Sequence, residues 1–360
     1  MTRLFMTADA VGGVWTYALE LAGALAPLGY ETTLALLGPA PSESQRAEAA
    51  AVPNLALVET DLPLDWLAAE EGEVRETARV LARLARAERA DLIQLNQPAF
   101  AAEPMPAPVI AVVHSCVATW WRAAGEGPLP DGFRWQTAMV RCGLARADAV
   151  IAPSAAFAAE VQEVYRLSGR PLAVHNGRTP SPATAGALHD FVLTAGRLWD
   201  KGKNAATLDK AAAHLGVPFK AAGSVTGPHG ETVSFQNLHV RGLLEAGALA
   251  DCYAARPVFA SAALYEPFGL AVLEAAQAGC PLVLSDIPTF RELWGDAAIF
   301  VTPTDARGFA DAIEELIGNV PLRLAQGDLA KARAARFTAG AMAAGMDAAY
   351  RPVLGRKVAA

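Results

Sequence analysis

Little in this sequence suggests a metal centre, a disulfide framework or a membrane span. The four cysteines lie far apart and include no Cys-x-x-Cys pair, which predicts small buried side chains in a reducing compartment. No apolar stretch reaches the roughly 18 residues that a membrane-spanning helix needs. Five histidines show no metal-ligand spacing, so we expect no bound metal. These are His175, His189, His214, His229 and His239.

An excess of positive charge is also missing. The formal net charge is −7, and no long run of one sign occurs. Non-specific binding to nucleic acid needs a basic face that neutralises phosphates, so no nucleic-acid partner is expected, although a local basic patch stays possible. Arg3 precedes only a short apolar run, which does not resemble a signal peptide. We expect a cytoplasmic protein, with peripheral membrane contact through an amphipathic helix left open.

What the chain does contain is apolar material for two domains. At 360 residues, with 53% hydrophobic residues, it is too long for one typical domain. Short continuous apolar runs alternate with helical patterns such as Val74, Ala78, Leu81 and Ala85, and this alternation predicts doubly wound α/β sheets. The predicted strands include residues 4–6, 34–37, 92–95, 109–113, 149–151, 191–194, 258–260, 282–284 and 299–301.

A break in the pattern separates two Rossmann-like domains. The segment 178–190 (RTPSPATAGALHD) is typical of a linker, and the α/β alternation then restarts. We predict domains at 1–178 and 187–340, with an Ala-rich final helix in 341–360 that packs back on the first domain. Ligands of such sheets bind beyond the carboxyl ends of the strands, so the expected active site is a cleft between the two domains.

The segment from Tyr265 to Glu274 carries the strongest functional signal. Pro267 suits the first turn of a helix, which would place Glu266 at or just before the helix start. The free amides of Phe268, Gly269 and Leu270 would then face an anion such as a diphosphate. Glu274 would lie about 80° further round an ideal helix, so both carboxylates could reach one ligand. The alternative is a capping glutamate and an ordinary exposed helical glutamate.

A second candidate site follows the strand that ends near Ala195. The loop presents Arg197, Lys201 and Lys203, and cations at the carboxyl end of a strand suit a diphosphate. A solvated surface loop is the alternative, above all for Lys201.

A third candidate lies between the first strand and the first helix. Gly12 and Gly13 would let the backbone approach a phosphate at a helix N-terminus, although a plain tight turn explains them equally well. The turn lacks Gly-x-Gly-x-x-Gly, which argues against a dinucleotide-dependent oxidoreductase. Trp15 follows, and core packing of the first helix is one explanation for it.

His114 forms a fourth candidate at the end of the run 109–113, where a histidine would reach a ligand site. Trp120 and Trp121 come next. Paired indole rings could stack on a ligand, or pack in the core or in an interface.

The Glu-x₇-Glu arrangement with Pro-Phe-Gly-Leu, followed by Ala-Gly-Cys-Pro-Leu-Val-Leu, resembles the retaining glycosyltransferases of the GT-B fold in the large family four. The resemblance covers nearly the whole chain and is strongest over 191–305. It implies that Glu274 binds the nucleotide ribose and that Glu266 lies beside the donor sugar. It also implies that Arg197 and a lysine neutralise the diphosphate. Lys203, followed by Asn204, fits the family pattern better than Lys201.

The same resemblance assigns Gly12 and Gly13 to the donor-phosphate loop and His114 to the donor sugar. It implies hexosyl transfer with retention from a nucleotide sugar, most commonly of the UDP type, without a cofactor. The acceptor could be a glycan, a lipid-linked molecule or a small metabolite. Trp15, Trp120 and Trp121 are the candidates on the acceptor side, where the two adjacent tryptophans could stack on a sugar ring or an aglycone. The sequence contains no Asp-x-Asp, the metal-diphosphate signal of the other major glycosyltransferase fold. A nucleotide-sugar epimerase, a phosphorylase and a non-catalytic binding protein stay open as alternatives.

Overall fold

The computed structural model of the chain describes residues 1–181, 186–228 and 230–358. Residues 182–185 of the predicted linker, His229 and the last two residues of the predicted C-terminal segment therefore lie outside the described residues. The chain divides into two compact units. Unit 1 comprises Met1–Gly177 and Thr338–Ala360, and unit 2 comprises Arg178–Phe337.

Within the described residues, unit 1 contains a seven-stranded parallel sheet in the order β3-β2-β1-β4-β5-β6-β7. Its strands are β1 (Thr2–Asp9), β2 (Tyr30–Leu37), β3 (Leu55–Glu59), β4 (Leu92–Leu95), β5 (Val109–Val112), β6 (Ala149–Ala152) and β7 (Leu172–Ala173). On β1, Leu4 and Met6 alternate with Phe5, and all three side chains are buried. Burial on both faces explains the continuous apolar runs in the sequence.

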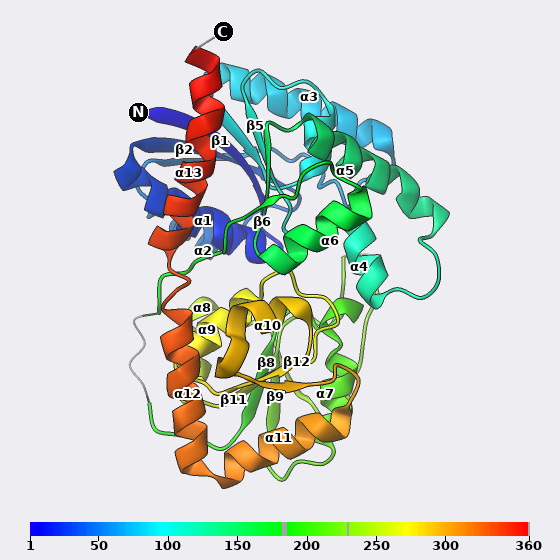
Figure 1. Cartoon of the computed structure of the whole chain (residues 1–360), viewed down its shortest axis with the longest axis vertical. Coiled ribbons are helices and arrows are strands. Elements are labelled where there is room, and N and C mark those ends of the chain that lie inside the picture. Colours follow the sequence, from blue (N-terminus) through cyan, green and yellow to red (C-terminus); the bar gives the residue numbers. More distant parts are fainter. Residues whose placement is uncertain (182–185, 229, 359–360) are drawn as a thin grey trace. The chain divides into compact units, whose positions relative to one another are not determined.

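The helices of unit 1 cover this sheet. They are α1 (Gly13–Leu25), α2 (Glu43–Ala50), α3 (Glu71–Ala87), α4 (Val117–Ala124), α5 (Arg134–Arg146), α6 (Ala155–Tyr165) and α13 (Ala339–Val358). The C-terminal helix α13 lies beside α1 (Figure 1). It buries Met342, Met346 and Tyr350 in the core that α1 shares with one face of the sheet. The end of the chain therefore completes the unit with which the chain begins.

Unit 2 repeats the same plan, with a six-stranded parallel sheet in the described residues, ordered β10-β9-β8-β11-β12-β13. Its strands are β8 (Val192–Ala195), β9 (Phe219–Ala222), β10 (His239–Gly242), β11 (Val258–Ser261), β12 (Leu282–Ser285) and β13 (Ile299–Val301). Its helices are α7 (Ala205–Ala212), α8 (Ala246–Ala254), α9 (Leu270–Gln277), α10 (Pro288–Trp294), α11 (Ala306–Gly318) and α12 (Val320–Ala334). Separate apolar clusters fill the two faces of the sheet, one including Phe259 and the other Val258.

Both sheets confirm the predicted doubly wound α/β class. In each, the strand order reverses between two neighbouring strands, at β1 and β4 in unit 1 and at β8 and β11 in unit 2. Helices on opposite faces diverge at such a point and leave a crevice beyond the carboxyl ends of the strands. The candidate residues follow these strands or their neighbours, so the fold gathers them at the ligand-binding edge of each sheet.

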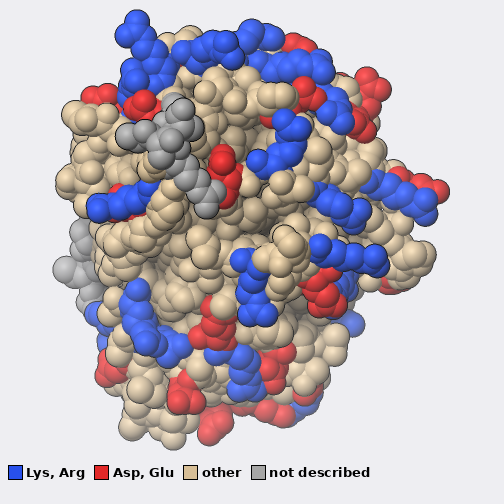
Figure 2. Space-filling model, turned by 45° about the horizontal axis from the view of Figure 1, so that its top comes forward, with Lys and Arg blue, Asp and Glu red and all other residues tan. Residues whose placement is uncertain are grey.

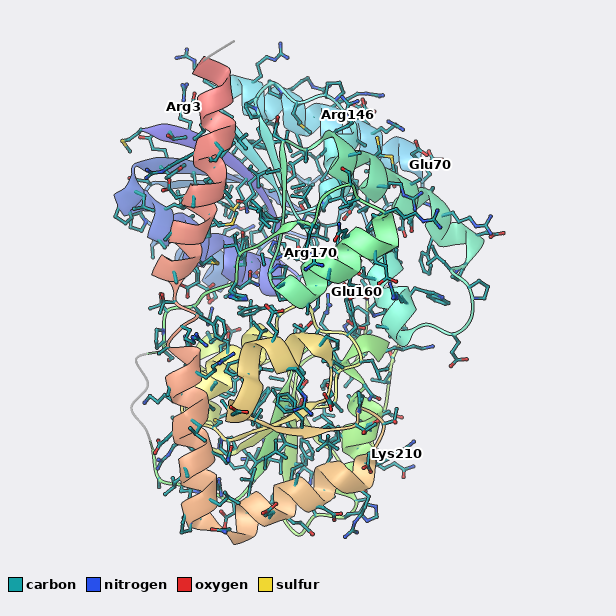
Figure 3. The ribbon with its side chains drawn as sticks, in the orientation of Figure 1. Arg3, Glu70, Arg146, Glu160, Arg170 and Lys210 are labelled. Carbon is teal, nitrogen blue, oxygen red and sulfur yellow. The ribbon has the colours of Figure 1, made fainter. Side chains whose placement is uncertain are left out.

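Charges at helix ends complement the helix dipoles. Glu70 precedes the first residue of α3, and Arg146 occupies the last turn of α5; Figure 3 labels both. A negative charge at the N-terminus and a positive charge at the C-terminus each stabilise a helix by about 0.3–1 kcal/mol. These exposed charges have a local structural reason and need no ligand to explain them.

Figure 2 shows basic and acidic side chains side by side over the displayed face of the molecule. None of the helices in the described part of the chain combines the length and the hydropathy that a membrane span requires. Among residues 1–181, 186–228 and 230–358, no three His, Cys, Asp or Glu side chains form a group that could hold a metal ion.

Candidate active site

The loop after β8 is organised by one buried carboxylate. Asp200 Oδ1 accepts a hydrogen bond from Gly202 N at 2.8 Å, and its Oδ2 accepts one from Arg197 Nη2 at 3.1 Å. The guanidinium of Arg197 also lies 5.6 Å from the centre of the Trp199 ring. Asp200 therefore fixes the turn and holds the half-exposed Arg197 at the carboxyl edge of the sheet.

The two lysines of this loop have different surroundings. Lys201 is exposed, whereas Lys203 is half-buried and its ammonium forms an ion pair with Glu266 Oε2. A lysine shielded from water and held against a carboxylate has a fixed position, which a solvated lysine lacks. The geometry therefore favours Lys203 over Lys201 as the lysine of this site.

The loop between β11 and α9 differs from the sequence prediction. We expected Pro267 in the first helical turn, but the helix begins only at Leu270. Gly269 is its N-cap, with φ of 92°, a conformation that ends the helix on that side and that favours glycine. Phe268 is buried edge-on against Phe337 and fixes the loop before the helix. The free amides of the helix end consequently start at Leu270.

Because Glu266 lies before the helix, the predicted 80° relation to Glu274 does not hold. Glu274 is a half-buried residue of α9, and its Oε1 lies 2.9 Å from Nε of Arg178. The two carboxylates thus hold separate cations, Lys203 and Arg178. Arg178 was predicted to begin the linker, and nothing in the local sequence signals this pairing.

A small cavity at the carboxyl edge of unit 2 brings several of these groups together. Its lining includes Gly196, Lys203, Glu266, Ser261 and the first turn of α9. A Cβ on Gly223, at the end of the neighbouring strand, would lie 1.7 Å from the carbonyl oxygen of Gly196. The strand ends therefore meet backbone to backbone. A cation, a carboxylate and helix amides around one cavity can hold a ligand with anionic and hydroxyl groups.

In unit 1, the start of α1 follows β1 directly. Gly12 is the N-cap of α1 in an extended conformation, and no side chain of the described residues caps the helix. Asp9 Oδ1 accepts a hydrogen bond from Val11 N at 3.0 Å. Trp15 is 4% exposed in the core, and its indole N–H donates to Glu48 Oε2 at 3.1 Å. This burial favours the core-packing alternative for Trp15.

His114 lies just beyond β5 and is held by neutral groups. Its Nε2 lies 3.0 Å from Oδ1 of Asn96, and its ring contacts the ring of Tyr17 edge-on at 4.4 Å. Burial lowers the pKa of His114 to about 3, so the imidazole is neutral near pH 7. Asn96 was not predicted from the sequence, although its place just after β4 is a signal of the same kind as that of His114.

Asp65 is a second residue with unusual surroundings that was not predicted from the sequence. It follows β3, and burial together with the charge of Asp9 raises its pKa to about 6, while a hydrogen bond from Trp66 N opposes the shift. A carboxyl group with such a pKa can exchange a proton near neutral pH.

Trp120 and Trp121 lie on α4, beyond β5. Both are half-buried with their ring centres 6.0 Å apart, and the indole N–H of Trp121 donates to the carbonyl of Gly127 at 3.1 Å. Trp121 also packs against Phe133, at 5.9 Å between ring centres. The segment that follows α4 therefore holds the aromatic pair in place, and part of its surface stays open to solvent.

Two family models match successive parts of the chain. Residues 11–181 match the family described as Glycosyltransferase Family 4, and residues 189–319 match the family described as Glycosyl transferases group 1. No curated protein sequence matches the chain.

Solved structures resemble the whole chain. A sucrose-phosphate synthase from Thermosynechococcus elongatus is 19% identical, with 99% of this chain and 100% of that chain covered and a TM-score of 0.80. HepE from Anabaena, in complex with UDP and glucose, is 19% identical, with coverages of 98% and 99% and a TM-score of 0.70. A TarM mutant from S. aureus, in complex with fondaparinux, alpha-GlcNAc-glycerol and UDP, is 10% identical, with coverages of 96% and 99% and a TM-score of 0.73. At these identities the likeness establishes the fold.

Proposed function

The chain belongs to the GT-B-fold glycosyltransferases, and from this premise we propose that it is a retaining enzyme that transfers a hexosyl group from a nucleotide sugar to an acceptor hydroxyl. One observation carries the proposal: the Lys203–Glu266 ion pair at the cavity beside the start of α9. A leaving diphosphate needs cations and amides, and a sugar needs a carboxylate that accepts hydrogen bonds from hydroxyls.

In unit 2, the proposal gives Arg197, Lys203 and the amides around Leu270 the task of stabilising the departing diphosphate. Arg197 supplies a planar fork and Lys203 a point charge. Phe268 and Gly269 shape the loop that leads to these amides. When a diphosphate binds, Lys203 exchanges its carboxylate partner for a phosphate, and Glu266 becomes available to the sugar.

Glu274 is proposed to accept hydrogen bonds from the ribose hydroxyls. Its present partner, Arg178, holds the carboxylate in place through an ion pair. In unit 1, Gly12 and Gly13 are proposed to accommodate donor phosphate, His114 to contact the sugar, and Trp120 and Trp121 to contribute to acceptor binding.

In the proposed reaction, the bond from the anomeric carbon to the diphosphate breaks on the same face on which the acceptor oxygen attacks. The acceptor proton passes to the leaving phosphate oxygen, so retention needs no separate protein base. Ordered cations and amides lower the barrier because they stabilise charge that develops on the leaving group. A cytoplasmic location belongs to the same proposal and is supported by four cysteines that form no disulfide in the structure.

UDP is the proposed nucleotide, since solved structures of similar fold contain UDP or UDP-glucose. Calorimetric titration of UDP, GDP and ADP into the wild type tests this proposal. We expect micromolar binding of one nucleotide and a 10- to 100-fold weakening, about 1.4–3 kcal/mol, in Glu274→Ala. The exposed Glu315 on α11 provides a matched control, because Glu315→Ala removes the same charge far along the chain.

Absence of binding of every nucleotide to the folded wild type would contradict the proposed donor site. Release of free nucleotide only when an acceptor is present separates transfer from epimerase chemistry. Formation of a glycoside product without release of a sugar phosphate separates transfer from phosphorolysis. Donor binding without turnover on any acceptor would indicate a non-catalytic binding protein.

A further inference from the structure

The side-chain amide of Asn96 has only one orientation that satisfies its neighbours. Its Nδ2 lies 2.6 Å from the backbone carbonyl oxygen of Thr7, which can only accept a hydrogen bond. The nitrogen of the amide must therefore lie on that side. The oxygen, Oδ1, consequently faces His114 Nε2 at 3.0 Å.

A second contact fixes the same orientation. Oδ1 of Asn96 accepts a hydrogen bond from Gln94 Nε2 at 2.9 Å. Gln94 is itself fixed, because its Oε1 accepts from the hydroxyl of Tyr350 and its Nε2 lies 3.2 Å from the hydroxyl of Tyr17. Gln94, Asn96 and Tyr350 are all buried, so bulk water does not compete for the hydrogen bonds of this network.

Because Oδ1 of Asn96 only accepts, Nε2 of His114 must carry a proton. A neutral imidazole with a proton on Nε2 has a bare lone pair on Nδ1. Within the described residues, the imidazole has the Asn96 hydrogen bond and the Tyr17 ring as its recorded contacts. Nδ1 is thus an acceptor without a protein donor in that part of the chain.

The surroundings also keep the ring uncharged. The neighbours that face it are the amide of Asn96 from the end of β4 and the ring of Tyr17 from α1, and neither carries charge near pH 7. Burial is the cause that lowers the pKa of His114 to about 3, with no charged side chain contributing. The imidazole is therefore neutral near pH 7, and the contact with Asn96 selects its tautomer.

We propose that Asn96 is a positioning residue that holds His114 with its proton on Nε2, so that Nδ1 accepts a hydrogen bond from a hydroxyl of the donor sugar. This inference rests on the proposed function, in which His114 contacts that sugar. It also defines a substrate class. A neutral acceptor nitrogen binds a hydroxyl, repels the lone pairs of a carboxylate and loses its partner when a sugar lacks the hydroxyl.

Nitrogen-15 NMR of the histidine rings in the full-length wild type tests the tautomer without any substrate. We expect a protonated Nε2 and a bare Nδ1 for His114, unchanged across the pH range near neutrality. His114→Gln assigns the resonance. A proton on Nδ1, or a titration near the ordinary histidine pKa of 6.5, would overturn the proposal. This readout stands even if the protein proves to transfer no sugar.

Asn96→Asp tests the positioning role, because a carboxylate beside the ring raises the pKa of His114 toward neutrality. We expect UDP-glucose binding to become dependent on pH in this variant. Gln97→Glu is the matched control. It makes the same amide-to-acid exchange at a buried neighbour that contacts Thr7 Oγ1 and leaves the imidazole contact intact. Equal pH dependence in both variants would contradict a specific role for Asn96.

UDP-glucose and UDP-glucuronate test the substrate class, since a carboxylate replaces one hydroxymethyl group in the second probe. We expect the wild type to bind UDP-glucose at least ~10-fold more tightly, a loss typical of an unmatched polar group. In Asn96→Asp this preference should shrink at low pH, where the imidazole becomes a cation. Equal binding of the two probes by the wild type would overturn the substrate class. Failure to bind UDP itself would instead overturn the proposed function.

Discussion

The two units share one architecture but differ in the chemistry at the carboxyl edge of the sheet. In unit 2, the candidate groups are ions held in pairs: Lys203 with Glu266, Arg178 with Glu274, and Arg197 with Asp200. In unit 1, His114 is a neutral ring held by amides and a tyrosine. The same fold therefore carries ion pairs at the carboxyl edge of one sheet and a neutral, hydrogen-bonded ring at the carboxyl edge of the other.

Removing a cation from unit 2 should produce the largest effect. We expect Lys203→Ala to lower kcat by about 10²–10³-fold, because a leaving diphosphate loses a fixed charge in the transition state. Steady-state transfer assays measure this effect. Lys201→Ala changes an exposed lysine of the same loop and should leave kcat within about twofold. Equal losses in the two variants would remove the distinction between these lysines.

Lowering the pH should reduce the free energy of unfolding through His114 in unit 1. Folded His114 has a pKa of about 3 and an ordinary value of 6.5, so the unfolded chain binds this proton first as the pH falls. The contribution to stability is complete above the ordinary value and is lost below it, by about 2 kcal/mol at about pH 5. Urea unfolding at about pH 7 and at about pH 5 should show this loss in the wild type but not in His114→Gln. Parallel losses would mean that His114 is not buried as a neutral ring.

Arg197→Lys should have a smaller effect, because it keeps the charge and removes the fork. We expect kcat to fall about 10-fold, since a lysine makes a single directed contact where the guanidinium makes two. Arg291→Lys is the control in the same unit, at an exposed arginine that pairs with Asp286. An unchanged kcat in Arg197→Lys would indicate that Arg197 serves the loop through Asp200 and not the ligand.

The smallest expected effect is that of salt, which should weaken binding in unit 2 and leave the tautomer of His114 in unit 1 unchanged. Raising the ionic strength to physiological levels should weaken UDP binding a few-fold, because half-exposed cations are screened. The tautomer of His114, which depends on short contacts to neutral groups, should not change. Calorimetry and NMR on the same samples measure both quantities. Salt-independent UDP binding would show that charge contributes little in unit 2.

The sequence predicts the fold well where strands are buried on both faces. Continuous apolar runs such as 92–95 and 282–284 are strands in the structure. Four strands of the described residues are not among the predicted runs: β3, β7, β9 and β10. β7 has two exposed residues and β10 presents three to solvent, whereas β9 is buried apart from the half-buried Lys220 that interrupts its apolar run. At the edge of a sheet, backbone pairing defines a strand that the pattern of side chains does not reveal.

The candidate site is predictable in position but not in detail. Strand ends pointed to His114 and to the loop of Arg197, since carboxyl edges collect ligands. The start of α9 was placed wrongly because Pro267 suits a first helical turn, whereas Gly269 adopts φ of 92° and delays the helix. The partners Asn96 and Arg178 are far in sequence from His114 and Glu274. Only the packing of separate segments brings such pairs together.

The return of α13 to unit 1 has a consequence for biosynthesis. Unit 2 is a continuous segment and has all its residues once Phe337 has been made, whereas unit 1 still lacks Met342, Met346 and Tyr350. On the ribosome, the first unit to begin synthesis is therefore the last that can complete its core. Until then, the buried side of α1 and the amide of Gln94 lack partners from a segment that is translated more than two hundred codons after Gln94.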